Sequence, residues 1–445
     1  MPFDTSGAAD ALRRRRIEFV KQLDLIDSPM RLFDFQRDLA NEIRAVEPAA
    51  YRDRGSLERE HLKALRLIGD AIAWQTLHPH TIRQLSKHPG KPPALGSQGE
   101  AFEFVIACAR MAAEARHPVR ICDLTNVLRI GDLIIGEPEQ PMLIECAPDA
   151  PASFRLRGRK ARQLARMEAV AEVLRQGHGH VPGTPAPIKV YESPLQSEYS
   201  WHVVESAARA ALANGAGLAA GDSDVVWALR ADATDAGALP LATDVADMTS
   251  GFSDPLVALS STLLDEPSPL VPPPLAWPLP LDLRLALLER EIRLVHVVDL
   301  ARFLEIEHEG ARIIDVRRDQ RGDLLEACFI IQSGDLTSAA SRRFVDDVIY
   351  GFMTIESSVK ALLSCVGNID ESEGHELHSA RTGPLSRLLD ELVERQQTPG
   401  GGAEGRAWTT AGRRSPERSG KNSATEPDRR ISPETRKELF PGLSK

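Results

Sequence analysis

The sequence predicts an α/β protein in which a mixed sheet is flanked by helices, and three patterns indicate this class. Residues 119–135 and 141–147 are rich in Val, Ile and Leu, as strands are. The segments 97–115 and 155–177 around them place apolar residues at three- and four-residue intervals, which is typical of amphipathic helices. The order of helix, strands and helix, with a further strand at 185–193, is that of a sheet with helices packed on it.

The N-terminal region, residues 1–90, is predicted to be helical. Three of its segments have the apolar spacing of a helix: 11–26, 30–46 and 56–77. Turn-forming residues separate them, first at Asp27–Pro29 and again at Asp53–Ser56. The basic run Arg13–Arg16 could meet phosphates, but a solvated helix start is the simpler interpretation.

The central region, residues 91–265, is predicted to be the α/β core with an extension. Its extension holds a helix at 201–215 and a strand at 225–231. A proline-rich linker is predicted at 266–282, where seven prolines stand close together.

The C-terminal region, residues 283–395, is predicted to be a smaller α/β unit. The turn signal at Arg318–Asp323 joins two strands into a hairpin, and a helix is predicted at 338–363. Residues 396–445 contain mostly Gly, Ser, Pro, Arg and Glu with few core formers, so a disordered tail is predicted.

Composition excludes several classes of protein. The chain has 445 residues and a net charge of -10, which disfavours a protein that coats nucleic acid by electrostatics but not one with a local basic cleft. A run of about 18 apolar residues would indicate a membrane span, and the sequence has none. The five cysteines are scattered and lack CxxC spacing. We therefore predict a cytoplasmic protein with neither a disulfide framework nor a structural zinc site.

Two carboxylates, Asp132 and Glu145, stand near the ends of the predicted strands in apolar surroundings. A buried carboxylate is costly unless it has a partner. Acids from neighbouring strands are the hard oxygen ligands that Mg²⁺ or Mn²⁺ prefers, and such ions activate water for phosphodiester hydrolysis. Glu100 from the preceding helix and the backbone carbonyl of Cys146 complete the predicted metal site.

The fragments GEAFEF, RIGDLII, LIECA and RKARQLARM resemble the PD-(D/E)xK nuclease superfamily, which has a restriction-endonuclease-like core. The resemblance covers Gly96–Ser193, about a quarter of the chain. It implies that Glu100 is the helix acid and that Asp132 and Glu145 are metal ligands. It also implies substrate contacts from the basic segment that follows, at Arg157, Arg159 and Gln163. The implied activity is Mg²⁺-dependent hydrolysis of DNA in bacterial defence, restriction or repair.

The sequence departs from the family pattern at Ala147, where the family has lysine. One explanation is that Lys160, on the following helix, has taken over the catalytic role of that lysine. The other is that the site has lost its chemistry and that a pseudo-nuclease now binds DNA or a protein partner of a defence system. Without a replacement the loss is severe, because removing one well-placed charge stabiliser typically costs about 100-fold or more in rate.

Simpler roles exist for each acid. Asp132 follows Gly131 and fits a turn, and Glu100 is favoured in a first helical turn by the helix dipole. Glu145 could form an ion pair with Arg129 or with an arginine of the basic segment. A further alternative is a small-molecule enzyme that uses Asp132 and Glu145 as an acid/base pair. The basic residues at a helix start oppose the dipole there, which favours an anionic partner.

Overall fold

The structure, a computed structural model, describes residues 5–53, 55–86, 92–138, 141–146, 159–181, 188–189, 193, 195–231, 244–245, 247–259, 262–265, 271–320 and 323–367. All of these residues lie in one compact unit, Met1–Asp390. The second unit, Glu391–Lys445, lies outside the described residues, and so does the predicted disordered tail at 396–445. In the described part the chain combines helices with several antiparallel sheets, which confirms the predicted α/β class.

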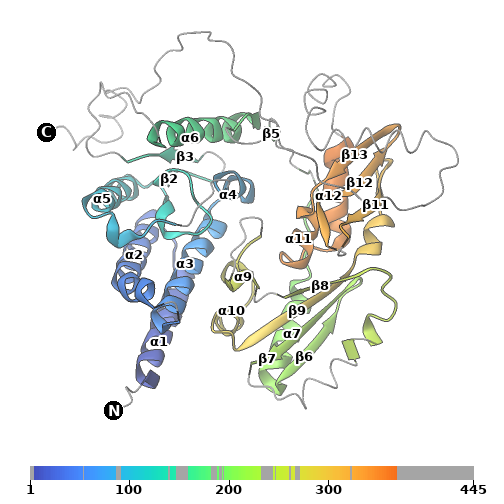
Figure 1. Cartoon of the computed structure of the whole chain (residues 1–445), viewed down its shortest axis with the longest axis horizontal. Helices are drawn as coiled ribbons and strands as arrows, with labels where there is room; N and C mark the ends of the chain where they lie inside the picture. The colour runs from blue at the N-terminus through green and yellow to red at the C-terminus, as the bar shows by residue number, and fades with distance from the viewer. Residues whose placement is uncertain are drawn as a thin grey trace, which may run out of the picture. The chain divides into compact units, whose positions relative to one another are not determined.

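The N-terminal helices lie where the apolar spacing predicts them (Figure 1). Ser28 and Ser56 each accept a hydrogen bond from a backbone N–H three residues ahead, so each serves as a helix N-cap. Pro29 occupies the first position of its helix, where its missing N–H costs nothing. The bounds are α1 (Thr5–Leu23), α2 (Pro29–Arg52), α3 (Leu57–Thr76) and α4 (Pro79–Leu85).

The first sheet is a three-stranded antiparallel meander in the order β1-β2-β3. Its register pairs Val119 with Ile135 and Leu133 with Ile144. The described strand pairings are antiparallel throughout, in contrast to the predicted mixed sheet. The elements of this part are α5 (Glu100–Glu114), β1 (Val119–Ile121), β2 (Leu133–Ile135), β3 (Met142–Ile144), α6 (Arg159–Gln176), β4 (His178–Gly179) and β5 (Ile188–Lys189).

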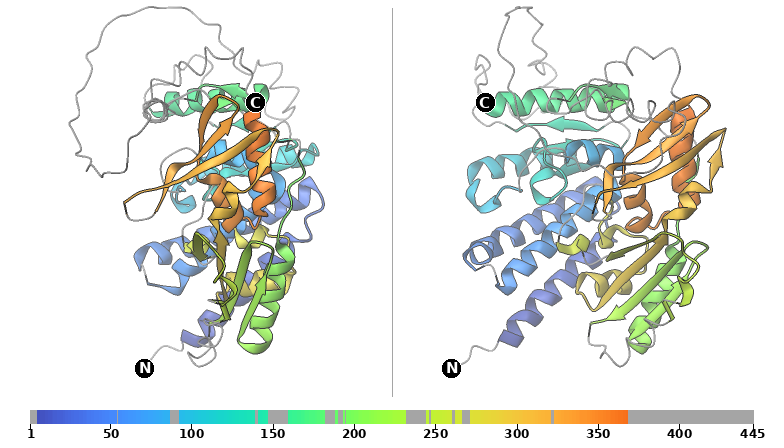
Figure 2. Two further views of the ribbon diagram at one scale, coloured as in Figure 1. Left: turned by 90° about the vertical axis from the view of Figure 1, so that its right-hand side faces the viewer. Right: turned by 45° about the vertical axis from the view of Figure 1, so that its right-hand side comes forward.

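Helices cover both faces of this meander. Leu133 and Ile135 belong to the apolar core that α2 and α5 share, whereas Ile134 belongs to the core formed with α4 and α6. Successive strand residues point to opposite faces, so the alternation follows from strand geometry. Figure 2 shows α6 and α5 on opposite sides of these strands.

A buried glutamine closes the outer edge of the meander. Gln36 of α2 donates from Nε2 to the carbonyl of Val119 at 2.7 Å and accepts from the N–H of Ile121 at 2.8 Å. Its side-chain amide therefore takes the place of a neighbouring strand along β1. This satisfies backbone groups that an open edge would leave unpaired.

The second sheet has the order β6-β7-β9-β8, and α7 packs on it. β9 follows the predicted linker, so this sheet combines strands from both sides of it. The described part of that linker is packed: Leu275 and Trp277 are buried in apolar clusters that other elements form. The bounds are α7 (Trp201–Asn214), β6 (Ala216–Ala220), β7 (Asp224–Arg230), β8 (Pro255–Leu259), α9 (Thr262–Asp265), η3 (Pro274–Ala276), α10 (Leu281–Leu288) and β9 (Ile292–Asp299).

The third sheet contains the predicted hairpin, which is confirmed as the antiparallel pair β11 and β12. The helix predicted at 338–363 is instead a strand followed by two helices. Phe352 has a φ of 53°, in the left-handed region, which ends the first helix before the second begins. The bounds are η4 (Leu300–Leu304), β10 (Glu307–His308), β11 (Ala311–Arg318), β12 (Leu324–Ser333), β13 (Leu336–Ala340), α11 (Arg343–Ile349) and α12 (Ile355–Gly367).

Candidate functional site

Asp132 and Glu145 lie at matching ends of two neighbouring strands. Asp132 directly precedes β2 and Glu145 directly follows β3, and the adjacent residues Leu133 and Ile144 pair with each other. The N–H of Asp132 donates to the carbonyl of Ile144 at 2.9 Å, which extends the ladder by one bond. Both acids therefore belong to the same end of the sheet.

The carboxylate of Asp132 holds the chain that leaves β3. Its Oδ2 accepts the N–H of Cys146 at 2.6 Å, and the charge of a carboxylate acceptor strengthens such a bond. This bond orients the carboxylate toward the segment that contains Glu145. This structural role differs from the turn predicted after Gly131, because the bond joins two strands that are 14 residues apart in the chain.

The thiols of Cys146 and Cys122 both lie near Asp132 and Glu145. A hydrogen bond with Cys108 of α5, together with burial, raises the pKa of Cys146, and the charges of Asp132 and Glu145 act in the same direction. Burial also raises the pKa of Cys122, again with a contribution from Asp132 and Glu145. High thiol pKa values disfavour thiolates, so neither Cys122, which is buried, nor Cys146, which is half-buried, is favoured as a nucleophile.

The loop that leads into Asp132 is anchored by a buried acid on α3. Asp70 accepts the N–H and the side-chain amide of Asn126 at 2.6 and 2.7 Å, and the N–H of Val127 at 3.2 Å. Burial raises the pKa of Asp70 to about 6, although these hydrogen bonds oppose the shift. Asp70 therefore anchors the loop that leads into Asp132, and the pKa of Asp70 itself lies well above its ordinary value.

A buried ion pair between α2 and α3 holds the segment ahead of α5. Arg66 contacts Glu47 at 3.1 Å, and both side chains are nearly inaccessible, at 6% and 3% exposure. Glu47 accepts the N–H groups of Leu95 and Gly96, at the start of η1 (Leu95–Ser97). Arg66 also donates to the carbonyl of Asp123 in η2 (Cys122–Leu124). The Arg66–Glu47 pair therefore holds both η1, which precedes α5, and η2, which follows β1.

Glu100 does not join the two strand acids in a cluster. It is the exposed first residue of α5. Within the ranges given above, no three or more His, Cys, Asp or Glu residues are grouped so that they could hold a metal ion. Two carboxylates and the carbonyl of Cys146 are hard oxygen donors of the type that Mg²⁺ accepts.

The residues predicted to contact the substrate, or their side chains, lie outside the described part of the chain. Arg157 and Ala147 lie outside the described residues. α6 begins at Arg159, which puts Lys160 and Gln163 in its first turns, but the side chains at 159–163 also lie outside the description. The predictions for these residues stay predictions.

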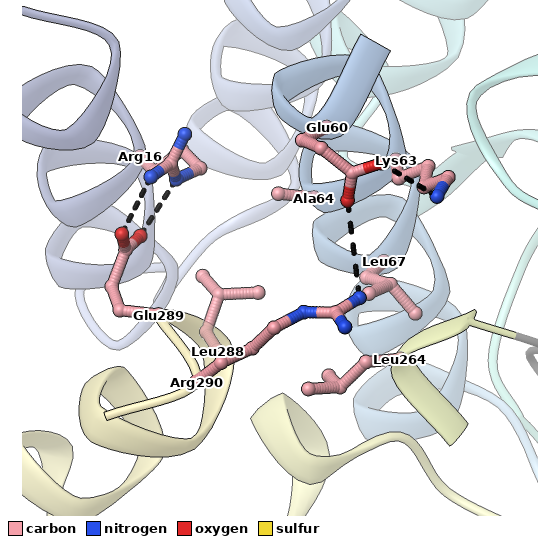
Figure 3. A pocket seen from close by; sticks show the side chains of 9 residues that line it. All are labelled: Arg16, Glu60, Lys63, Ala64, Leu67, Leu264, Leu288, Glu289 and Arg290. Carbon is pink, nitrogen blue, oxygen red and sulfur yellow. Dashed lines mark hydrogen bonds and ion pairs between the residues drawn. The ribbon is translucent and has the colours of Figure 1, made fainter. Parts of the chain in front are cut away.

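The basic run of α1 meets carboxylates of this chain. Arg16 forms two hydrogen bonds with Glu289, at 2.6 and 2.5 Å (Figure 3), and Arg15 contacts Glu42 at 3.0 Å. Arg13 pairs with Glu291. Three of the four arginines are therefore paired with acids of this chain, because α1 packs near α2 and near the residues that follow α10.

The sequence interpretation missed the charged residues that support the site: Asp70, Glu47 and Arg66. A signal for Asp70 was present, because an acid within the apolar run LRLIGDAIAW of α3 requires buried partners. Its partner Asn126 lies 56 positions away in the chain, and no local pattern identifies it.

The chain matches no protein-family model, no curated protein and no solved structure. Among the described helices, none has both the length and the apolar character that crossing a membrane requires.

Proposed function

We propose that residues 96–193 form a restriction-endonuclease-like core that hydrolyses DNA phosphodiester bonds with the help of a divalent cation. The observation that carries this proposal is the pair of acids, Asp132 and Glu145, at matching ends of β2 and β3. The element order of a helix, a three-stranded antiparallel meander and a second helix also supports it. A setting in defence, restriction or repair follows from the family resemblance alone.

The cation would be Mg²⁺ or Mn²⁺, held by the two carboxylates and the carbonyl of Cys146, and it would supply a Lewis acid that activates water. The N–H of Cys146 keeps the carboxylate of Asp132 in one orientation. Lys160, in the first turn of α6, takes the charge-stabilising role that Ala147 cannot perform. Arg159 and Gln163 on the same helix bind the phosphate backbone.

Plasmid cleavage by the full chain in the presence of Mg²⁺ or Mn²⁺ tests this proposal. Asp132→Asn and Glu145→Gln each remove one ligand charge with little change in volume, so each is expected to abolish cleavage. Glu172→Gln, an exposed acid of α6, is the matched control and is expected to retain full activity. Cleavage that persists in both site variants would refute the proposed site.

A second candidate function is DNA binding without hydrolysis. Three observations favour it: Ala147 replaces the lysine of the family, Asp132 is engaged by the backbone of Cys146, and the described residues offer two carboxylates rather than three. Fluorescence anisotropy with labelled duplex DNA distinguishes the two functions. Salt-sensitive binding that Lys160→Gln weakens, with no cleavage under any metal condition, would establish the binding function in place of the catalytic one.

A further inference from the structure

A buried histidine of the second sheet lies between two hydrogen-bond acceptors. His296 of β9 is only 2% exposed. Its Nε2 lies 3.0 Å from Oδ2 of Asp224 in β7, and its Nδ1 lies 3.0 Å from the carbonyl oxygen of Ile349, the last residue of α11. The ring therefore links the second sheet to the end of a helix that belongs to the apolar core of the third sheet (Figure 1).

The two contacts of this ring require two protons. A backbone carbonyl only accepts hydrogen bonds, and so does an ionised carboxylate. A neutral imidazole carries a proton on one nitrogen and a lone pair on the other, so it satisfies only one of the two acceptors. The pair of His296 and Asp224 therefore holds one proton more than a neutral imidazole and a free carboxylate hold together.

The surroundings of the ring favour an imidazolium ion. Phe352 stacks on His296 with 4.8 Å between the ring centroids and 27° between the ring planes. A cation over an aromatic face is attracted by the quadrupole of that ring. Burial of a lone charge would be costly, but Asp224 supplies the opposite charge at hydrogen-bond distance. The extra proton is therefore placed on the imidazole.

The other charged groups on the elements around the ring have partners of their own. Strand β8 has no charged residue, and Arg293 and Asp299 of β9 point to the opposite face of the sheet. Burial raises the pKa of Tyr350, so its hydroxyl stays neutral, and His202 of α7 is exposed. The remaining pairs are Asp346 with Arg342, Asp347 with Arg83, Glu205 and Asp282 with Arg209, Arg284 with Asp24, and Arg230 with the carbonyl of Leu212.

We propose that His296 is a pH-sensitive clamp between the second sheet and the end of α11. With a proton on both nitrogens, the ring donates to Asp224 and to Ile349 at once. When the pH rises and one proton passes to the solvent, Nε2 keeps its proton, because a hydrogen bond to a carboxylate is stronger than one to a carbonyl. The lone pair of Nδ1 then faces the carbonyl of Ile349, and their repulsion releases the end of α11.

Nitrogen NMR of the full chain, labelled at its histidines, follows the ring protons from about pH 5 to about pH 9. The signals of His296 are identified by their absence from His296→Gln. We expect protons on both nitrogens at the acidic end and on Nε2 alone at the alkaline end.

Hydrogen exchange on the same samples measures the opening of the clamp. The N–H of Ser200 donates to the carbonyl of Phe352 at 2.8 Å, just beyond α11. Its protection factor is expected to fall about tenfold as His296 loses its proton, because a hydrogen bond to a charged group contributes at least that much. The N–H of Ile121 in the first sheet is the control, and its protection factor is expected to stay unchanged over the same step.

Asp224→Asn keeps the shape of the contact and changes the number of protons that it needs. The amide of asparagine donates to Nε2, so a neutral ring with its proton on Nδ1 satisfies both neighbours. We expect this variant to show a proton on Nδ1 alone at alkaline pH and a Ser200 protection factor that no longer falls. Glu205→Gln, which changes an exposed acid of α7, is the matched control and should keep the wild-type pH dependence.

Two results would overturn the proposal. One is Ser200 protection that stays constant in wild type while His296 loses its proton, and this result needs no variant. The other is the same fall of Ser200 protection in wild type and in Asp224→Asn.

Discussion

The first and second sheets are held in place in different ways. The meander of β1, β2 and β3 has strands of three residues each, and buried polar groups from α2 and α3 fix its edge and its loops. The second sheet has longer strands and close apolar packing with α7, and it also contains a buried polar pair in which His296 of β9 and Asp224 of β7 lie 3.0 Å apart. The comparison teaches that buried polar groups fix the edge and the loops beside the candidate site, whereas apolar packing against α7 is the main contact of the second sheet.

The largest expected effect comes from breaking the charges behind the first sheet. Arg66→Ala leaves Glu47 buried without its cation, and the loss of one member of a buried pair typically costs about 3–5 kcal/mol. Urea unfolding measures this loss. The control Arg110→Ala removes an exposed pair with Glu114 and should cost about 1 kcal/mol or less. Equal losses in the two variants would mean that burial of the Arg66–Glu47 pair does not add to its contribution.

The pH dependence of stability sharpens the same comparison. The folded pKa of Asp70, about 6, lies above its ordinary value of 3.8, so protonation stabilises the fold. This contribution is fully present below about pH 4 and is lost as the pH rises through about 6, and it amounts to roughly 2–3 kcal/mol. Chemical denaturation across this range should show the decline in wild type. An identical decline in Asp70→Asn would assign it to other groups.

The second sheet should respond to added volume. A Cβ on Gly217 would lie 2.1 Å from the carbonyl oxygen of Ala207 in α7, so Gly217→Ala must push helix and sheet apart. Overpacking of this kind costs about 2 kcal/mol, measurable by thermal unfolding. Gly251→Ala is the matched control, because a Cβ there meets nothing within 4 Å. A stable Gly217→Ala variant would show that α7 is not closely fitted to β6.

A smaller effect is expected at the edge of the first sheet. Gln36→Ala removes the amide that pairs with Val119 and Ile121, and we expect a loss of about 1–2 kcal/mol because water can replace part of this pairing. Hydrogen exchange at the N–H of Ile121 should accelerate in this variant. Unchanged protection of that N–H would mean that Gln36 does not close the edge.

Local patterns in the sequence predicted the parts of the fold that local interactions determine. Helices α1 to α3 follow from apolar spacing and capping serines, and the hairpin of β11 and β12 follows from its turn signal. Strand β8 pairs with β9 from a distant part of the chain, so no local pattern predicts it. Trp277 is buried within a proline-rich segment for the same reason, since its environment comes from other elements.

The candidate site could be predicted in part. Carboxylates beside apolar strand residues draw attention to Asp132 and Glu145 because burial without a partner is costly. The bond from the N–H of Cys146 to Asp132 could not be predicted, because it depends on how the chain leaves β3. The anchoring of the loop by Asp70 was equally hidden, since α3 and the loop meet only in the folded chain.

Titration of the full chain with Mn²⁺, followed by electron paramagnetic resonance, tests most directly whether the two strand acids share a cation. We predict one bound Mn²⁺ per chain in wild type, and its loss in both Asp132→Asn and Glu145→Gln. Mn²⁺ binding that survives in either variant, or a wild-type chain that binds none, would contradict this account.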